Sequence, residues 1–248
     1  MTRSAEEKPK TARAGGPTAV AKAMTTDFDW VVYADATFAG LAILLPFPFV
    51  DSWLENYFRR RMPRDIARRR GRVLSQTAVR EVNRQRDEGF VRGCLLWPLQ
   101  QVVYLVRNMY RTVVYFFTVV DATDKLSHYW HRAFLIDYMI ARGHLDNDPS
   151  AAAAGEALRR VLQTVETSPM RNLAAELIEF SSGRARGLIR AFYRFLRRRE
   201  QTAEFKLQRQ TIADRWAEFG DYLPEVADAY ETTLAAVQRE RAPAAQTG

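Results

Sequence analysis

Apolar positions recur at helical spacing along most of the chain, whereas patterns typical of strands are nearly absent. Runs of β-branched residues are short, and no Asn-Gly or Asp-Gly pair marks a tight hairpin. Apolar residues three and four positions apart instead indicate amphipathic helices. The pattern predicts an all-α fold, a multi-helix bundle, with residues 26–240 as a single domain. The polar, alanine-rich residues 1–25 are expected to form a disordered tail, and residues 241–248 a loose C-terminal tail.

Prolines and capping residues divide the first half of the pattern into helices. A helix is predicted at residues 27–45, with Thr25 or Thr26 as its N-cap, and the prolines that follow at positions 46 and 48 must interrupt it. A second helix is expected to start near Asp51 or Ser52. Pro63 is then expected at the first position of a third helix, where proline fits without losing a hydrogen bond.

The second half of the chain predicts one long helix and several shorter ones. Residues 99–142 contain neither glycine nor proline, which permits a helix of up to 44 residues, with a break near residues 121–124 as an alternative. A turn is predicted at residues 146–149. The further helices are expected to begin near Pro149, Pro169, Arg184 or Thr202, and Tyr222 or Pro224.

Residues 30–50 form the most hydrophobic window of the chain. The window contains one acid, Asp35, and it is interrupted near its end by Pro46 and Pro48. A helix over residues 30–45 is only about 24 Å long, less than the roughly 30 Å of a bilayer's hydrocarbon core. Three interpretations stay open: a buried core hairpin, a hairpin that dips into one leaflet, and a transmembrane span.

The segment 34–71 resembles the hydrophobic helical hairpin of bacterial EcsC-type and YcjF-type membrane-associated proteins. The resemblance covers 38 of 248 residues. It rests on Pro46, Pro48 and Asp51 at the turn and on Ile66, Ala67 and Gly71 in a following I-A-x-x-Y-G-like element, where Arg70 occupies the tyrosine position. The resemblance implies membrane association of a helical protein and no established chemistry.

Arginine is concentrated in two segments, which we call the first and second basic segments. Residues 59–72 hold eight arginines and one acid, and residues 184–199 hold seven arginines and no acid, whereas the whole chain carries a net charge of only +8. Such concentration predicts surfaces that attract a polyanion. The candidate membrane- or anion-binding residues are Arg59, Arg60, Arg61, Arg64, Arg68, Arg69, Arg70, Arg184, Arg186, Arg190, Arg194, Arg197 and Arg198.

The second basic segment has the pattern of a basic amphipathic helix. Its aromatic and aliphatic residues occupy an arc of about 160°, and arginines fill most of the complementary arc. An interfacial membrane helix requires this pattern, and the arginine face also suits nucleic-acid phosphates. Packing of the apolar arc inside the bundle, with solvated arginines, is a third interpretation. Nucleic acid ranks below membrane because no known DNA- or RNA-binding signature accompanies the charge.

One face of the long helix holds candidate metal ligands within about 80° of arc. These are Asp121, Asp124, His128 and His131. With a carboxylate from Glu176 or Glu179 on a neighbouring helix, they could bind a divalent metal, as in di-metal helical bundles. Ordinary side-chain pairing of Asp124 with His128, four residues apart, explains the same pattern.

The signatures of common enzyme classes are missing from the sequence. There is no P-loop, no Gly-x-Ser-x-Gly and no dinucleotide-binding motif. The single cysteine, Cys94, is expected to be a buried apolar residue, and it excludes a disulfide framework. A reducing compartment such as the cytoplasm is favoured.

We therefore expect a protein that associates peripherally with an anionic membrane at the inner face, without a cofactor, through a hydrophobic hairpin and the two basic segments. The first alternative is a metal-dependent helical-bundle enzyme. The second is a nucleic-acid-binding protein, and a protein partner is a further option.

Overall fold

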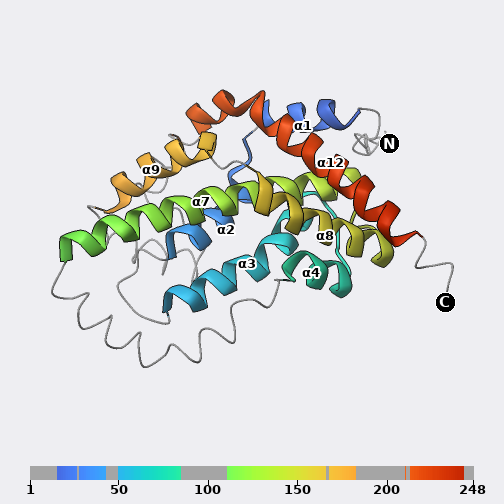
Figure 1. Cartoon of the computed structure of the whole chain (residues 1–248), viewed down its shortest axis with the longest axis horizontal. Helices are drawn as coiled ribbons and strands as arrows, with labels where there is room; N and C mark the ends of the chain where they lie inside the picture. Colours follow the sequence, from blue (N-terminus) through green and yellow to red (C-terminus); the bar gives the residue numbers. More distant parts are fainter. Residues whose placement is uncertain are drawn as a thin grey trace, which may run out of the picture.

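The computed structural model describes residues 16–26, 28–42, 50–84, 111–165, 168–182, 210 and 213–242. In these residues the chain is helical and forms no strand, which confirms the all-α prediction. The α-helices are α1 (Pro17–Thr26), α2 (Trp30–Leu41), α3 (Val50–Arg69), α4 (Gln76–Asn83), α7 (Arg111–Arg142), α8 (Asp148–Thr164), α9 (Ser168–Ser182) and α12 (Tyr222–Arg241), and η2 (Ala217–Phe219) is a 3-10 turn (Figure 1).

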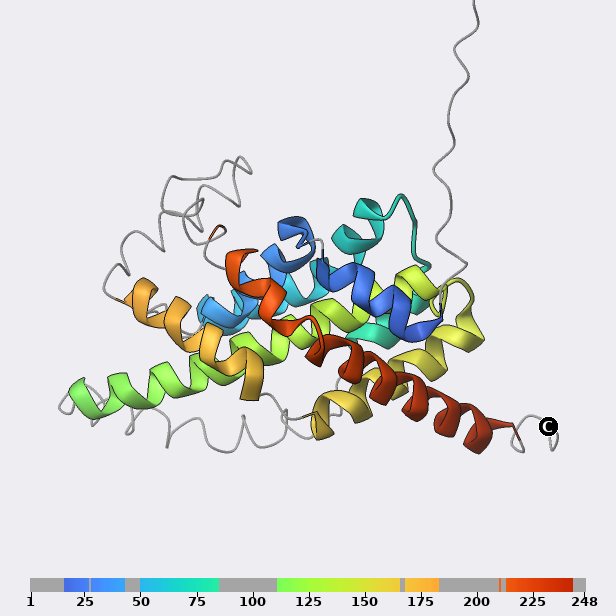
Figure 2. The ribbon, with the colours of Figure 1, turned by 90° about the horizontal axis from the view of Figure 1, so that it is seen from above.

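Helix α7 is the central element of the bundle. Helices α2, α3, α8 and α9 pack against it, and α12 lies across α8 and α1 (Figures 1 and 2). All residues from Ala133 to Ile140 of α7 are at most 4% exposed. Because these eight positions cover every face of a helix, α7 is enclosed on all sides over this stretch.

Helix α2 approaches α7 closely because of a glycine. A β-carbon built on Gly40 would lie 2.5 Å from the Cα atom of Leu126 in α7. Since that neighbour is backbone, it cannot move aside as the end of a flexible side chain can. Trp130 of α7 adds a directed contact, because its indole N–H donates to the hydroxyl of Thr37 over 3.0 Å.

Two glycines end helices with the same local geometry. Gly71 and Gly143 have φ angles of 66° and 79°, which are unfavourable for residues with a β-carbon. After α3, the amide of Arg72 donates to Ala67 and that of Gly71 to Arg68, over 2.8 and 3.0 Å. This is the Schellman arrangement, which satisfies carbonyls at the helix end.

The start of α2 corrects the predicted cap. Asp29 is the N-cap residue, and its carboxylate accepts from the amide of Val31 over 3.0 Å. Thr25 and Thr26 instead end the preceding helix α1, where the hydroxyl of Thr25 donates to the carbonyl of Lys22. The two threonines and Asp29 are all good capping residues, so the sequence pattern alone did not decide between them.

Helix α1 also corrects the predicted disordered tail over residues 17–25. It packs against α12, and Ala21 is fully buried there. An alanine-rich helix needs such a partner, because so short a helix is marginal by itself in water. Residues 1–15 and 243–248 lie outside the described residues.

Helix α3 is continuous through Pro63, which therefore does not start a third helix. Proline lacks the N–H that would donate to the carbonyl of Arg59, and its interior position costs about 3 kcal/mol. Packing offsets this cost, since Met62, Ile66 and Ala67 on either side are at most 1% exposed. Helix α7 is likewise continuous through residues 121–124, without the break considered above.

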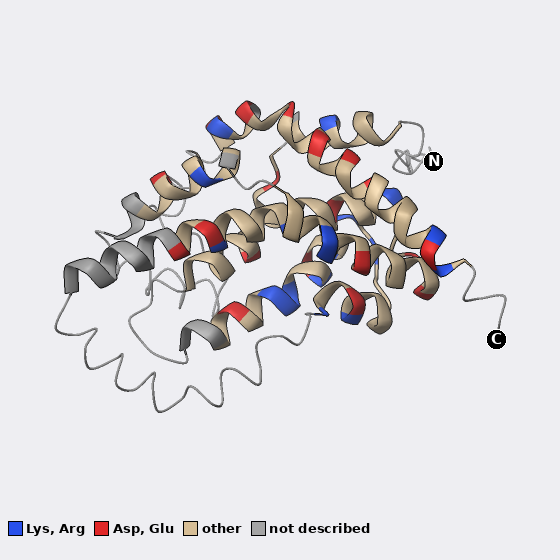
Figure 3. Cartoon of the chain, viewed as in Figure 1, with Lys and Arg blue, Asp and Glu red and all other residues tan. Residues whose placement is uncertain are grey.

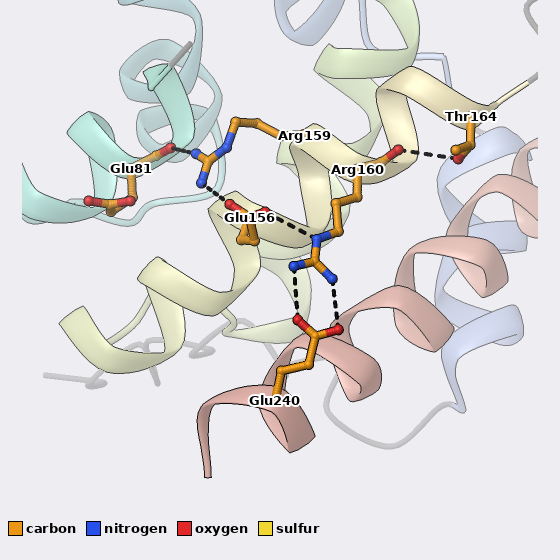
Figure 4. A network of polar contacts seen from close by, with 6 residues as sticks. All are labelled: Glu81, Glu156, Arg159, Arg160, Thr164 and Glu240. Atoms are coloured by element: carbon orange, nitrogen blue, oxygen red, sulfur yellow. Dashed lines mark hydrogen bonds and ion pairs between the residues drawn. The ribbon is translucent and has the colours of Figure 1, made fainter. Parts of the chain in front are cut away.

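The later boundaries confirm the sequence analysis. Asn147 caps α8 by accepting from the amide of Ser150 over 2.9 Å, and α8, α9 and α12 begin within one residue of predicted starts. Polar contacts then tie α8 to its neighbours: Arg159 reaches the carbonyl of Glu81 in α4, and Arg160 forks onto Glu240 in α12 (Figure 4). The predicted turn at positions 46–48, the part of the long helix before residue 111 and the helix expected at Arg184 or Thr202 lie outside the described residues.

Candidate functional site

The first half of the hydrophobic window is part of the protein core. Residues 32–42 are all buried, and Trp30 is only 4% exposed. Its indole belongs to a cluster with Phe28 and thus with Tyr33 and Trp216. The core interpretation therefore holds for residues 30–42 except Val31, which is 49% exposed, and residues 43–49 lie outside the described part of the chain. Among the described helices, none combines the length and apolar character needed to cross a membrane.

Most arginines of the first basic segment, whose positions on α3 are blue in Figure 3, are paired with the protein's own carboxylates. The pairs are Arg61 with Asp35 and Asp65, Arg68 with Asp65, Arg69 with Asp29, Arg70 with Asp137, and Arg72 with Asp146. Arg59 is buried, with 7% exposure. This segment is therefore largely an internal connector, and it does not present eight free guanidinium groups to a partner.

Two arginines of this segment remain on the surface without a carboxylate partner in the described structure. Arg60 and Arg64 are exposed, and they lie one turn apart on α3. The same face carries Trp53 and Tyr57, whose side chains are 61% and 39% exposed and whose rings stack at 5.8 Å. At 100° per residue these four positions fall within about 60° of arc. We call them the α3 stripe.

The sequence analysis missed the α3 stripe because the division at Pro63 separated Arg64 from Trp53, Tyr57 and Arg60. Once α3 is one helix, the spacing of Trp53, Tyr57, Arg60 and Arg64 is i, i+4, i+7 and i+11, which aligns residues along one face. A helical wheel drawn through Pro63 would have placed Trp53 and Tyr57 opposite the apolar Met62 and Ile66, which are buried in the structure.

The second basic segment, with Arg184, Arg186, Arg190, Arg194, Arg197 and Arg198, lies outside the described residues.

The candidate metal ligands point to different neighbours. Asp121 and Asp124 are exposed, and Asp124 pairs with Arg171 of α9 over 2.8 Å. His128 packs edge-on against the ring of Tyr129. Glu176, the proposed additional ligand, is bound by Arg215. No group of three or more His, Cys, Asp or Glu side chains that could hold a metal occurs among the described residues.

His131 is a buried connector between α7 and α12. Its Nδ1 lies 2.7 Å from the carbonyl oxygen of Ser127, and its Nε2 lies 2.6 Å from the hydroxyl of Tyr222. The carbonyl can only accept, so Nδ1 carries the proton and Nε2 accepts from Tyr222. Burial lowers the pKa of His131, which favours this neutral form. Both nitrogens are thus engaged within the fold.

Glu55 of α3 makes polar contacts with two residues of α7. The carboxylate of Glu55 accepts from the hydroxyl of Tyr129 over 2.6 Å and from the ammonium of Lys125 over 3.0 Å. Burial, followed by the nearby Glu55, raises the pKa of Tyr129 and keeps it a donor. Since Glu55 contacts residues 125–129 and Arg70 contacts Asp137, the two helices run in the same direction.

One turn along from this contact, two arginines are buried together at the α3–α7 interface. Arg59 and Arg132 are 7% and 6% exposed. Burial, and then the charges of Arg59 and Arg159, lower the pKa of Arg132 to about 10. Burial and the charge of Arg132 likewise lower the pKa of His128 to about 4, so this neighbouring ring is neutral at pH 7. The end of the predicted metal-binding face at His128 therefore lies beside a buried positive charge, which disfavours a bound cation there.

Neither the protein-family models, nor the curated proteins, nor the solved structures compared with this chain give a match. The resemblance of residues 34–71 to EcsC-type and YcjF-type proteins accordingly stays a prediction. The structure defines the class, an all-α bundle around an enclosed central helix.

Proposed function

We propose that this protein associates peripherally with anionic membrane surfaces through the α3 stripe. The observation that carries the proposal is the joint exposure of two stacked aromatic rings and two arginines on one helical face, in a protein whose other arginines of this segment are buried or paired. Tryptophan and tyrosine are enriched at the level of lipid headgroups, where an apolar ring with a polar edge is stabilised.

The charges of the stripe favour an anionic surface. Each arginine near an anionic leaflet contributes about 1 kcal/mol, so Arg60 and Arg64 together contribute about 2 kcal/mol. Partial insertion of Trp53 adds apolar burial to this attraction. The sum gives weak and reversible binding, for which a second contribution is needed if the protein is to stay on the membrane. The amphipathic pattern of the second basic segment is suited to supply it.

The stripe fits a membrane surface better than a nucleic acid. Single-stranded nucleic acids bind in basic grooves that follow the backbone over several nucleotides, with aromatic rings separated so that bases stack on them. On α3 the rings of Trp53 and Tyr57 stack on each other, and only Arg60 and Arg64 are available for phosphates on this face.

Co-sedimentation with vesicles tests the proposal. The protein should sediment with vesicles of phosphatidylglycerol and phosphatidylcholine, and much less with phosphatidylcholine alone. Replacing Arg64 by glutamate should weaken sedimentation severalfold and make it less sensitive to salt. Arg80→Glu is the matched control, because Arg80 is exposed on α4 and lies outside the stripe. Trp53→Ser should weaken binding at both low and high salt.

Two outcomes would contradict the proposal. Equal binding of the parent and of Arg64→Glu and Trp53→Ser would remove the α3 stripe from membrane contact. Salt-sensitive binding of single-stranded DNA, lost in the same variants while vesicle binding is absent, would assign the stripe to nucleic acid.

The contribution of the second basic segment is tested separately. Arg190, Arg194, Arg197 and Arg198 lie together on the predicted polar arc, and their joint replacement by glutamate should reduce binding to anionic vesicles. If this variant binds as the parent does while Arg64→Glu is weakened, membrane binding rests on α3 alone.

A further inference from the structure

The buried arginines at the α3–α7 interface lack acceptors for several of their N–H groups. Arg59 uses Nη2 to donate to the side chain of Asn56 over 2.9 Å, but its Nε and Nη1 have no hydrogen-bond partner. Arg132 uses Nη2 for the carbonyl of Val82 and the side chain of Asn83, over 2.7 and 3.1 Å, while its Nε has none. The three unpaired nitrogens carry four N–H bonds in all.

The charge of this pair is not compensated within the described structure. No described carboxylate lies within ion-pair distance of Arg59 or Arg132. The acid nearest to Arg59 in sequence, Glu55, is already bound to Lys125 and Tyr129. A buried polar group without a partner is destabilising, and a buried charge without one is more so, which is why such groups in folded proteins point to a missing ion or water.

We infer that Arg59 and Arg132 form a binding site for a small oxyanion of the phosphate type. Their two positive charges match a dianion. A tetrahedral oxyanion presents acceptor oxygens in several directions, as N–H groups from two different helices require, whereas a carboxylate presents two in one plane. Guanidinium groups with unsatisfied N–H bonds gain more from such a ligand than exposed arginines do, because water competes less for them.

The site is independent of the proposed membrane association. It is formed by the interface side of α3, whereas the α3 stripe lies on the exposed side of the same helix. Arg59 and Arg60 are neighbours in sequence, yet one is buried and the other exposed. This pair supplies a matched comparison, because the same substitution at either position removes the same charge from adjacent positions.

Titration with inorganic phosphate, by calorimetry and by thermal unfolding at constant ionic strength set with chloride, tests the inference. The parent protein should bind phosphate saturably, with a melting temperature that rises with phosphate and not with chloride. Arg59→Met should weaken phosphate binding at least about tenfold, as expected for the loss of a charged hydrogen-bonding partner. Arg60→Met should bind phosphate as the parent does.

The melting temperature without phosphate gives a second test, because the substitution that weakens phosphate binding should not lower it. If Arg59 is held without a counter-ion, Arg59→Met should unfold at the same temperature as the phosphate-free parent or higher, because an uncompensated buried charge has been removed. A variant that is both more stable and unresponsive to phosphate cannot be explained by general disruption of the fold. Should Arg59→Met fail to fold, Arg59→Lys, which keeps the charge but has fewer N–H groups, replaces it and should bind phosphate more weakly than the parent.

A competition experiment distinguishes a free oxyanion from the phosphate of a lipid headgroup. Phosphatidylglycerol vesicles should not compete with inorganic phosphate if the site takes a free oxyanion, and competition would identify a lipid phosphate as the ligand. Three results would overturn the inference. Phosphate could stabilise the parent no more than chloride does, or acetate could bind as tightly as phosphate. The third is an Arg59→Met protein that binds phosphate as the parent does. Each of these results leaves the vesicle-binding experiment unaffected.

Discussion

Arg70, directly after α3, donates hydrogen bonds from Nε and Nη2 to the two carboxylate oxygens of Asp137 near the C-terminal end of α7, each 2.7 Å long. The carboxylate side of this fork is 5% exposed and the guanidinium side 39%. Asp137 therefore depends on Arg70 for its charge partner, and an arginine that the sequence suggested for an external ligand holds two helices together instead. The same distinction between internal and surface arginines decides which residues are left for function.

The Arg70–Asp137 fork predicts a large difference between two arginines of the first basic segment. Arg70→Met leaves the carboxylate of Asp137 buried without a partner and should lower the free energy of unfolding by about 2–3 kcal/mol, somewhat less than for a fully buried pair. Arg64→Met removes the same group from an exposed position and should change it by less than about 0.5 kcal/mol. Urea denaturation of both variants measures this, and equal effects would show that the fork is not stabilising.

The low pKa of His128 predicts a loss of stability in acid. Burial, then the charge of Arg132, lower its pKa to about 4 despite the opposing Glu55, whereas the unfolded chain has an ordinary value near 6.5. The unfolded state therefore binds the proton more readily, and the free energy of unfolding should fall as the pH drops from about 6.5 towards 4. The total loss from this group is on the order of 2–3 kcal/mol.

His128→Phe tests the assignment, because it keeps a ring against Tyr129 and removes the titrating group. Its stability should depend less steeply on pH than that of the parent between pH 6.5 and 4, although His131 still contributes. Parallel curves for the two proteins would mean that His128 has an ordinary pKa in the folded state.

The contact of Gly40 with α7 predicts strong sensitivity to one added methyl group. In Gly40→Ala the new β-carbon meets the backbone of Leu126 at 2.5 Å, so helices α2 and α7 must separate. We expect a loss of at least about 2 kcal/mol, in the upper part of the range for overpacked cores. Gly16→Ala is the control, since nothing lies within 4 Å of its added β-carbon. If both variants have the melting temperature of the parent, this close packing of α2 and α7 is refuted.

The sequence predicted helix boundaries that depend on neighbouring residues, but it did not predict contacts between residues far apart in the chain. The turn before α8 follows from Asn147 and Pro149, which act on their immediate neighbours. The partner of Arg70 lies 67 residues away, and that of Arg72 lies 74 residues away. The sequence places both arginines just after α3, but it does not show which carboxylates the fold brings to them.

The two histidines of the predicted metal site show the same limit. His128 and His131 are three residues apart and share one side of α7, as the periodicity predicted. Their surroundings differ, because His131 meets Tyr222 of α12 while His128 is close to Arg132 at the α3 side. Periodicity gives the direction of a side chain from its own helix, whereas the chemistry of a site depends on what the neighbouring helices place opposite it.

Depth-dependent quenching of tryptophan fluorescence tests the central claim, that the exposed face of α3 meets the membrane. Of the described tryptophans, Trp53 is 61% exposed, whereas Trp30, Trp130 and Trp216 are at most 4% exposed, so among these four brominated lipid chains should reach Trp53. Anionic vesicles containing lipids brominated near the headgroup should quench the parent, and Trp53→Phe should lose most of that quenching while remaining bound. Vesicle binding with no quenching, or with equal quenching in Trp53→Phe, would contradict the account.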